Sequence, residues 1–226
     1  MIRPITLFTG QWADLPLEVV CQKAVEFGYE GLELASWGDH FDVFKGAESK
    51  AYCDEKRAVL AKYGLKNWAI SNHLAGQLIC DPNNDKRSDG FAPPEAAGDP
   101  EKKRQFGVDS MMASAKAAKN MGIEIVNGFT GSSIWHLLYS FPPNDWQDIE
   151  DGYKFFAKMF LPILDEFKAN GVKFALEVHP TEIAYDIPTT YKALEAVDYH
   201  ESFGFNFDPS HLQWQGIDPV RFLQEF

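Results

Sequence analysis

Two apolar runs in the second half of the chain share one plan, in which alternate positions are hydrophobic and polar groups gather at the end. The first run covers residues 173–180 and the second covers residues 203–211. Because side chains alternate between the two faces of a strand, the first run has one apolar face and one face that carries Glu177 and His179. The second run places Asp208 on its polar face in the same way. The pattern predicts two strands whose carboxylates converge at their carboxyl ends.

Amphipathic segments that end in glycine precede four of the predicted strands. Glycine readily takes the left-handed conformation that ends a helix, and the four joints are at Gly28, Gly64, Gly122 and Gly171. The predicted strands span residues 5–9, 31–35, 67–73, 123–127, 173–180 and 203–211. The predicted helices span residues 15–27, 49–63, 108–120, 152–169 and 189–197, and a last one begins at 218. This alternation predicts an α/β fold with a parallel sheet.

A (β/α)8 TIM barrel is the architecture that this repetition favours. A closed eight-stranded barrel typically needs about 250 residues, whereas these 226 residues end inside the sixth predicted helix. We therefore expect a single barrel domain over residues 1–226 that ends after about six βα units and lacks the last two. A doubly wound six-stranded sheet is the alternative, but the sequence has no GxGxxG after the first strand and no phosphate-binding loop.

The charge balance narrows the classes of partner. The chain has a formal net charge of -12 and 45% hydrophobic residues, so it lacks the basic surface that binding to nucleic acid or anionic lipid needs. No apolar stretch approaches the length of a membrane span, and the start of the chain has no extended hydrophobic leader region. Three widely spaced cysteines form no CxxC pattern, which is typical of reduced thiols. We expect a cytoplasmic protein.

Glu177 and Asp208 are the strongest candidates for chemistry. Two inward carboxylates close together repel each other unless a cation or a shared proton compensates them, and carboxylate oxygens are good ligands for divalent cations. The alternative is a structural salt bridge between one of them and a lysine or arginine. The sequence offers no basic residue of matching parity near the end of a strand, so we predict a metal site.

Three histidines are expected near the same strand ends. His211 follows Asp208 by three residues and could bind the metal or a substrate oxygen. His179 shares the parity of Glu177, although Pro180 could end the strand before it. His73 ends the third predicted strand on its inward face. Each is a candidate to bind substrate, and for each the alternative is a histidine that serves only local structure.

Aromatic residues lie in two predicted loops on the same side. The loop at residues 37–42 contains Trp37 and His40, which suit the apolar face and the hydroxyls of a sugar; packing within the loop is the alternative. The long loop at residues 129–150 contains Trp135 and His136. Long loops that follow strands usually carry function. Glu33 also faces inward but lies mid-strand, where a structural hydrogen bond is favoured.

These motifs resemble those of the xylose isomerase-like TIM barrels, a superfamily that includes sugar phosphate isomerases and epimerases, ketose 3-epimerases and endonuclease IV. The resemblance covers nearly the whole chain, and the Asp-Pro-Ser-His segment about 30 residues after a strand-ending glutamate is its most specific feature. The residues that carry it are 27–33, 71–73, 176–180 and 207–211.

The resemblance implies a set of metal ligands. Ketose 3-epimerases hold a divalent metal, often manganese, through a strand-five glutamate, a strand-six aspartate, a strand-seven histidine and a strand-eight glutamate. Glu177 and Asp208 correspond to the first two, and His211 resembles the histidine that contacts substrate oxygens beside the metal. The other two ligands are expected beyond Phe226.

We therefore expect a metal-dependent isomerase or epimerase of a sugar or keto-sugar, which removes a proton and forms a metal-stabilised enediolate. Glu177 is the expected catalytic acid or base, and His73 and His179 are expected to orient hydroxyls. Manganese is the first choice of metal, with magnesium, cobalt or zinc as alternatives. The alternative functions are a lyase, hydratase or dehydratase acting on an oxidised sugar or glycoside, and a non-catalytic carbohydrate-binding barrel or inactive fragment. A small sugar is the expected partner, and a homo-oligomer is a reasonable default.

Overall fold

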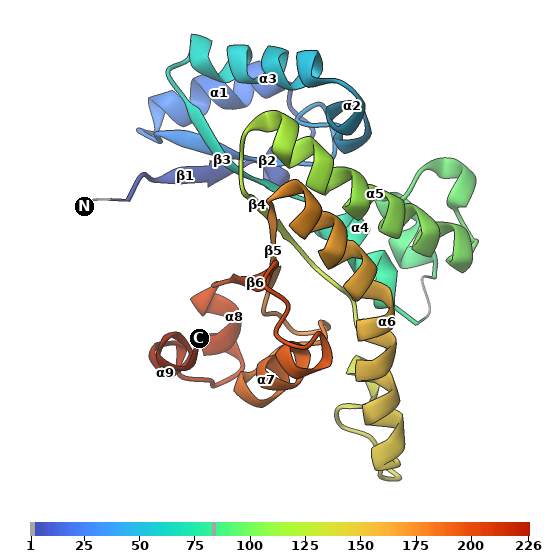
Figure 1. Cartoon of the computed structure of the whole chain (residues 1–226). Coiled ribbons are helices and arrows are strands. Elements are labelled where there is room, and N and C mark those ends of the chain that lie inside the picture. Colours follow the sequence, from blue (N-terminus) through green and yellow to red (C-terminus); the bar gives the residue numbers. More distant parts are fainter. Residues whose placement is uncertain (1–2, 83–84) are drawn as a thin grey trace.

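The computed structural model describes residues 3–82 and 85–226 (Figure 1). All six predicted strands are present, and they pair in parallel in the order β1-β2-β3-β4-β5-β6. The strands are β1 (Thr6–Phe8), β2 (Gly31–Ala35), β3 (Lys66–Ser71), β4 (Ile125–Gly128), β5 (Lys173–Glu177) and β6 (Phe203–Asn206). The outer strands of this sheet are β1 and β6, and the chain has the expected α/β fold.

Helices connect successive strands, as the glycine joints predict. The predicted helices correspond to α1 (Leu17–Glu26), α3 (Lys50–Lys62), α5 (Pro100–Met121), α6 (Trp146–Asn170), α7 (Ile187–Ala196) and α9 (Pro219–Glu225). Short 3-10 turns are η1 (Gly10–Trp12), η2 (Lys86–Phe91), η3 (Pro94–Ala96) and η4 (Trp135–Leu137). Both α5 and α6 end at a left-handed glycine, Gly122 and Gly171. None of the helices in the described part of the chain combines the length and hydrophobicity needed to cross a membrane.

Three further helices, which the sequence pattern did not predict, are α2 (Val43–Glu48), α4 (His73–Cys80) and α8 (Pro209–Trp214). The prediction that His73 ends the third strand was wrong: β3 ends at Ser71, and His73 opens α4. A close approach explains the position of this helix, because a Cβ at Gly76 would lie 2.1 Å from the Phe129 carbonyl oxygen. Glycine is the one residue that lets α4 pack directly against the loop after β4.

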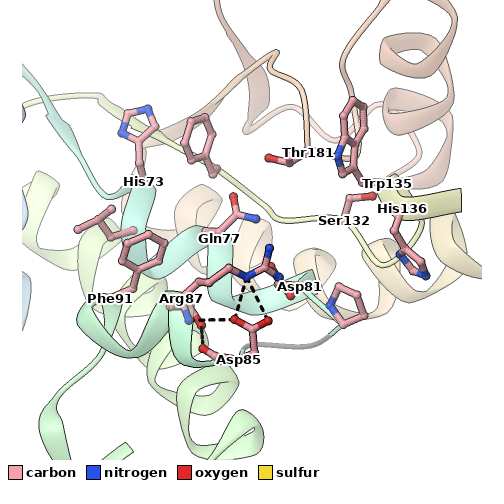
Figure 2. Close-up of a pocket in the computed structure, with 14 residues that line it drawn as sticks. His73, Gln77, Asp81, Asp85, Arg87, Phe91, Ser132, Trp135, His136 and Thr181 are labelled. Atoms are coloured by element: carbon pink, nitrogen blue, oxygen red, sulfur yellow. Dashed lines mark hydrogen bonds and ion pairs between the residues drawn. The ribbon is translucent and has the colours of Figure 1, made fainter. Parts of the chain in front are cut away.

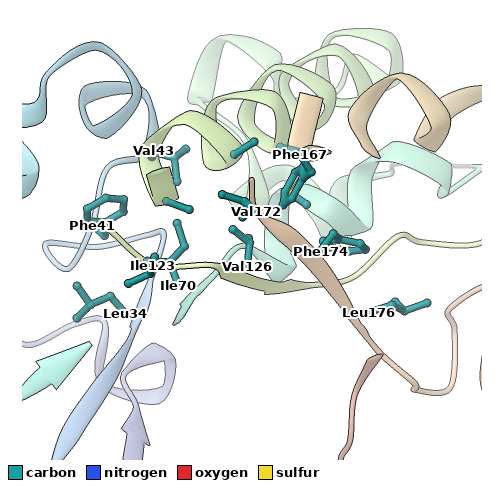
Figure 3. Close-up of a cluster of buried hydrophobic side chains, with 14 of the residues drawn as sticks. Leu34, Phe41, Val43, Ile70, Ile123, Val126, Phe167, Val172, Phe174 and Leu176 are labelled. Atoms are coloured by element: carbon teal, nitrogen blue, oxygen red, sulfur yellow. The ribbon is translucent and has the colours of Figure 1, made fainter. Parts of the chain in front are cut away.

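The hydrophobic core lies between the sheet and its helices (Figure 3). Phe174 on β5 is fully buried, and its ring centroid lies 5.6 Å from that of Phe160 and 5.9 Å from that of Phe167, both on α6. Phe203 on β6 stacks on the same ring at 6.2 Å. The alternation in β5 therefore points Phe174 and Leu176 at the helices, which leaves Glu177 on the opposite face.

We expect Phe174→Ala to lower the free energy of unfolding by about 3–5 kcal/mol, because it removes a buried ring and leaves a cavity that the surrounding phenylalanines fill only in part. Urea unfolding followed by circular dichroism measures the change. The matched control is Phe27→Ala, whose side chain is 61% exposed and whose loss should change stability by less than about 0.5 kcal/mol. Equal effects of the two substitutions would contradict this placement of the core.

Candidate metal and sugar site

Glu177 is the last residue of β5, and both of its carboxylate oxygens have partners. Its Oε1 lies 3.1 Å from Nε2 of His211. Its Oε2 lies 3.1 Å from Nε2 of His73 and accepts a 3.0 Å hydrogen bond from Nδ2 of Asn206. Asn206 pairs with Glu177 in the register of β5 and β6, so the sheet itself brings the amide to the carboxylate. The role of Asn206 was missed at the sequence level, although its inward parity was a usable signal.

Asp208 and His211 reach the same place from α8. Asp208 is the N-cap of this helix, and its Oδ1 accepts a 2.7 Å hydrogen bond from the Ser210 backbone N–H. The three-residue spacing puts His211 on the same side of the first turn, and its Nε2 lies 3.5 Å from Oδ2 of Asp208. One ligand atom each from Glu177, Asp208 and His211 lie within 4.8 Å of one another.

The donor set suits a divalent cation. Metal bonds to carboxylate oxygen and imidazole nitrogen are about 2.0–2.2 Å long, so ligands of one ion are separated by roughly 3–4.4 Å. The separations of His211 Nε2 from Glu177 Oε1 (3.1 Å) and from Asp208 Oδ2 (3.5 Å) lie in this range. Among the described residues, the ion-pair partners of Glu177 and Asp208 are histidines, and neither carboxylate pairs with a lysine or arginine. The structural salt bridge considered as the alternative is therefore not formed.

The surroundings favour the charged form of both carboxylates. Burial raises the pKa of Glu177, but the hydrogen bond and charge of His73, together with the charge of His211, outweigh it and leave the pKa below its ordinary value. Burial also raises the pKa of Asp208, and hydrogen bonds from Ser210 with the charge of His211 bring it below the ordinary value. Ionised carboxylates are the form that binds a cation.

Three other predicted residues are linked to this cluster through ring contacts. The ring of His179 meets that of His211 edge to face at 4.0 Å, and Phe129 lies 5.0 Å from His179 and 4.6 Å from His73. Phe8 lies 5.8 Å from His73 and packs against the edge of Trp37 at 5.9 Å. The structure thus brings His73, His179 and Trp37 to one end of the sheet.

His40 lies apart from the cluster. It is fully buried, its Nδ1 lies 2.8 Å from the Thr9 hydroxyl, and its Nε2 lies 3.1 Å from the Leu15 carbonyl oxygen. Both ring nitrogens are occupied inside the fold, which leaves none for a substrate. Glu33 accepts a hydrogen bond from the Ser71 hydroxyl on β3, in line with the structural role favoured for it.

A cavity of about 460 Å³ adjoins the cluster at His73 (Figure 2). It lies between α4, η2 and the loop after β4, and it includes none of Glu177, Asp208 or His211. Trp135 and His136, which the sequence singled out, both line it. Gln77 on α4 and Thr181 in the loop after β5 line it as well. No sequence pattern connects them with Trp135 and His136, because they come from separate segments of the chain.

Glu182 is a buried carboxylate that no sequence pattern indicated. Its Oε2 accepts hydrogen bonds of 2.7 Å from the backbone N–H groups of Thr130 and Gly131 and one of 3.1 Å from the Thr130 hydroxyl. Its Oε1 has no partner among the described residues. Glu182 thereby joins the loop after β5 to the loop after β4. Burial raises its pKa to about 7, against the lowering effect of these hydrogen bonds.

This pKa predicts a stability that depends on pH. In the unfolded chain Glu182 titrates near its ordinary value of 4.5, so the folded state holds the proton more tightly. Its contribution to stability is therefore fully present below that value and is lost as the pH rises through about 7. We expect stability relative to Glu182→Gln to fall by about 2–3 kcal/mol between pH 5 and pH 8. Urea unfolding of both proteins measures it, and a constant difference across this range would contradict the prediction.

A parallel β/α sheet that gathers carboxylates and histidines at its carboxyl end is typical of barrel enzymes. Residues 21–225 match the Xylose isomerase-like TIM barrel family, and the chain belongs to this family. The resemblance found in the motifs is thereby confirmed. A curated relative, the uncharacterized protein YfiH of Bacillus subtilis, is 25% identical over 96% of this chain and 67% of its own length.

Solved structures share the fold at low sequence identity. The probable 3-DHS dehydratase AsbF of Bacillus anthracis matches 99% of this chain and 69% of its own, with TM-score 0.66 and 21% identity. The 3-keto-D-glucoside 4-epimerase YcjR of E. coli matches 99% of this chain and 75% of its own, with TM-score 0.67 and 12% identity. A Mycobacterium smegmatis barrel protein in complex with magnesium matches 92% of this chain and 65% of its own, with TM-score 0.60 and 17% identity.

Proposed function

We propose that this protein is a divalent-metal-dependent isomerase or epimerase of a sugar or keto-sugar. The observation that carries the proposal is the cluster of Glu177, Asp208 and His211, whose ligand atoms converge within 4.8 Å at the carboxyl end of the sheet. Family membership and the fold shared with a keto-glucoside epimerase support the substrate class. Magnesium in one relative supports a divalent cation. Manganese remains our first choice, since the donor set combines two carboxylates with an imidazole.

The two oxygens of Glu177 suit different tasks. Oε1 faces His211, on the side of Asp208, and we assign it to the cation. Oε2 lies beside His73 and accepts a hydrogen bond from Asn206, and we assign it to removal of a proton from a substrate carbon, for which one of these two contacts must open. A bound divalent cation supplies positive charge against the negative charge that develops on substrate oxygen as the proton leaves.

The surrounding residues orient the carboxylate and the substrate. His73 and Asn206 approach Oε2 from different elements, so they fix the plane of the carboxylate before substrate arrives. The ring contacts of Phe129 with His73 and His179 hold these imidazoles in place. His179 packs against His211 and Trp37 against Phe8, and we propose that they contact hydroxyls and the apolar face of a sugar ring.

A lyase or dehydratase is the second candidate function, because removal of the same proton can also expel a leaving group from the next carbon. The fold shared with a probable dehydratase is the observation that keeps it open. Both reactions exchange hydrogen next to the carbonyl, so only the product separates them. An epimerase returns an isomer of the same mass, whereas a dehydratase releases water.

Incubation with keto-sugars in D2O tests the proposal. We expect deuterium to enter next to the carbonyl only when a divalent cation is present, and NMR to show an isomeric product. Loss of water from the product would favour the dehydratase. Absence of both exchange and product with every keto-sugar tried, in a protein that binds metal, would favour a non-catalytic carbohydrate-binding barrel.

A further inference from the structure

The cavity beside His73 has its own walls and its own polar groups (Figure 2). Its volume of about 460 Å³ falls within the range of roughly 300–1,000 Å³ that is typical of small-molecule sites. It approaches the cluster of Glu177, Asp208 and His211 through His73, whose Nε2 lies 3.1 Å from Oε2 of Glu177. A substrate that reacts at Glu177 therefore reaches this cavity only with a part that does not react.

Three aromatic residues provide flat apolar walls: Phe91, Phe129 and Trp135. Phe129 is fixed between the rings of His73 and His179, and Trp135 is held edge-on by Tyr185 at 5.1 Å. Rigid aromatic faces of this kind suit the C–H face of a pyranose ring, because they bury apolar area at little cost in conformational entropy.

Polar groups face the same space without partners in the fold. Figure 2 shows the Gln77 amide and the Thr181 hydroxyl directed into the region between His73 and Trp135. In the described part of the chain, neither side chain makes a hydrogen bond, and the His136 ring makes none either. An amide, a hydroxyl and an imidazole can donate to and accept from sugar hydroxyls.

Thr181 has a backbone conformation that indicates a functional constraint. Its φ is +82°, which is unfavourable for a β-branched residue. The next residue, Glu182, anchors the turn through its hydrogen bonds to Thr130 and Gly131. The same anchor joins the wall that carries Thr181 to the loop that carries Phe129 and Trp135. The fold thus holds a strained turn in place where its hydroxyl borders the cavity.

The charges of the cavity disfavour an anionic ligand. Among the described residues that line it, Asp81 and Asp85 are acidic and Arg87 is the one lysine or arginine. Nε of Arg87 is already paired with both carboxylate oxygens of Asp85, at 2.9 and 3.1 Å. The guanidinium of Arg87 is thus already compensated by a carboxylate, which leaves it less available to bind a phosphate group.

We infer that this cavity binds a second, uncharged pyranose ring of the substrate, so that the preferred substrate is a glycoside of a keto-sugar and neither a free nor a phosphorylated ketose. The inference rests on the proposed function of the Glu177 site. It assigns Gln77, Trp135 and Thr181 to recognition of the ring that does not react.

Calorimetric titration of the metal-loaded protein tests this without relying on turnover. The probes are D-fructose, fructose 6-phosphate, and the keto-disaccharides lactulose, turanose and isomaltulose. We expect at least one keto-disaccharide to bind about tenfold or more tightly than D-fructose, since the second ring adds stacking and hydrogen bonds. Fructose 6-phosphate should bind no more tightly than D-fructose.

Variants then locate the added affinity. Trp135→Ala and Thr181→Gly should remove the advantage of the disaccharide and leave the affinity for D-fructose within about twofold. Thr181→Gly is the safer variant, because glycine accepts the positive φ and the fold is retained. The control is Trp146→Ala, which removes an exposed tryptophan on α6 outside the cavity and should preserve the advantage.

The inference would be overturned if no keto-disaccharide binds more tightly than D-fructose, or if the advantage survives both Trp135→Ala and Thr181→Gly. Tighter binding of fructose 6-phosphate than of every disaccharide would also overturn it. Failure of the proposed function has a different signature, because binding of a disaccharide would persist while no ketose exchanges deuterium.

Discussion

Replacement of Glu177 by glutamine is expected to reduce deuterium exchange next to the carbonyl of a keto-sugar by about a thousandfold or more, since the variant loses both the base and an anionic ligand. The amide keeps the size of the side chain and one carbonyl oxygen, which can still accept from Asn206. Global folding should therefore be retained. NMR of the substrate in D2O measures exchange, and circular dichroism with thermal unfolding reports the fold.

The control for this substitution is Glu195→Gln, which makes the same chemical change on the exposed side of α7 and should leave exchange unchanged. Exchange at the unaltered rate in Glu177→Gln would remove Glu177 from the mechanism. Loss of exchange in both variants would point to a general effect of the substitutions and would contradict a specific role for the residue.

Replacement of Asp208 by asparagine is expected to weaken binding of a divalent cation by at least about 10–100-fold. Replacing a residue that only hydrogen-bonds to a metal ligand typically weakens metal affinity by this factor. Here the ligand itself loses its charge, so the loss should be at least as large. Asparagine is as good an N-cap as aspartate, so the hydrogen bond from the Ser210 N–H and the start of α8 should persist. Calorimetric titration with Mn²⁺ measures the affinity.

The chain contains a matched control for this substitution. Asp218 is the N-cap of α9, precedes a proline as Asp208 does, and accepts a 2.9 Å hydrogen bond from the Val220 N–H. Asp218→Asn therefore repeats the change in charge and cap at a helix that contributes no residue to the cluster. Its metal affinity should equal that of the unaltered protein. Equal losses in the two variants would contradict the assignment of Asp208 as a ligand.

The sequence predicted the strands and the polar end of the sheet well, because both depend on local alternation. The period of two in residues 173–180 separates Phe174 and Leu176 from Glu177, and burial in the structure follows this separation. The prediction of a strand over residues 203–211 was too long: β6 ends at Asn206, and Asp208 joins the cluster as the N-cap of α8. The glycine joints predicted where α5 and α6 end.

The features that the sequence missed depend on contacts between distant segments. His73 and Glu177 are 104 positions apart, and the start of α4 at His73 follows from its packing against the loop after β4. His40 is buried because its ring nitrogens contact Thr9 and Leu15. The aromatic residues next to it in the sequence suggested a sugar contact instead. Glu182 is held by backbone N–H groups of another loop, and backbone donors leave no signature in the sequence.

Metal content is the most direct test of the central claim that Glu177, Asp208 and His211 form a cation site. The purified protein is dialysed against trace manganese, magnesium, cobalt and zinc, and the bound metal is measured by elemental mass spectrometry beside Glu177→Gln and Asp208→Asn. We predict about one divalent ion per chain, lost in both variants and retained in Asp218→Asn. A folded protein without bound metal, or one whose metal content is the same in both variants, would contradict the account.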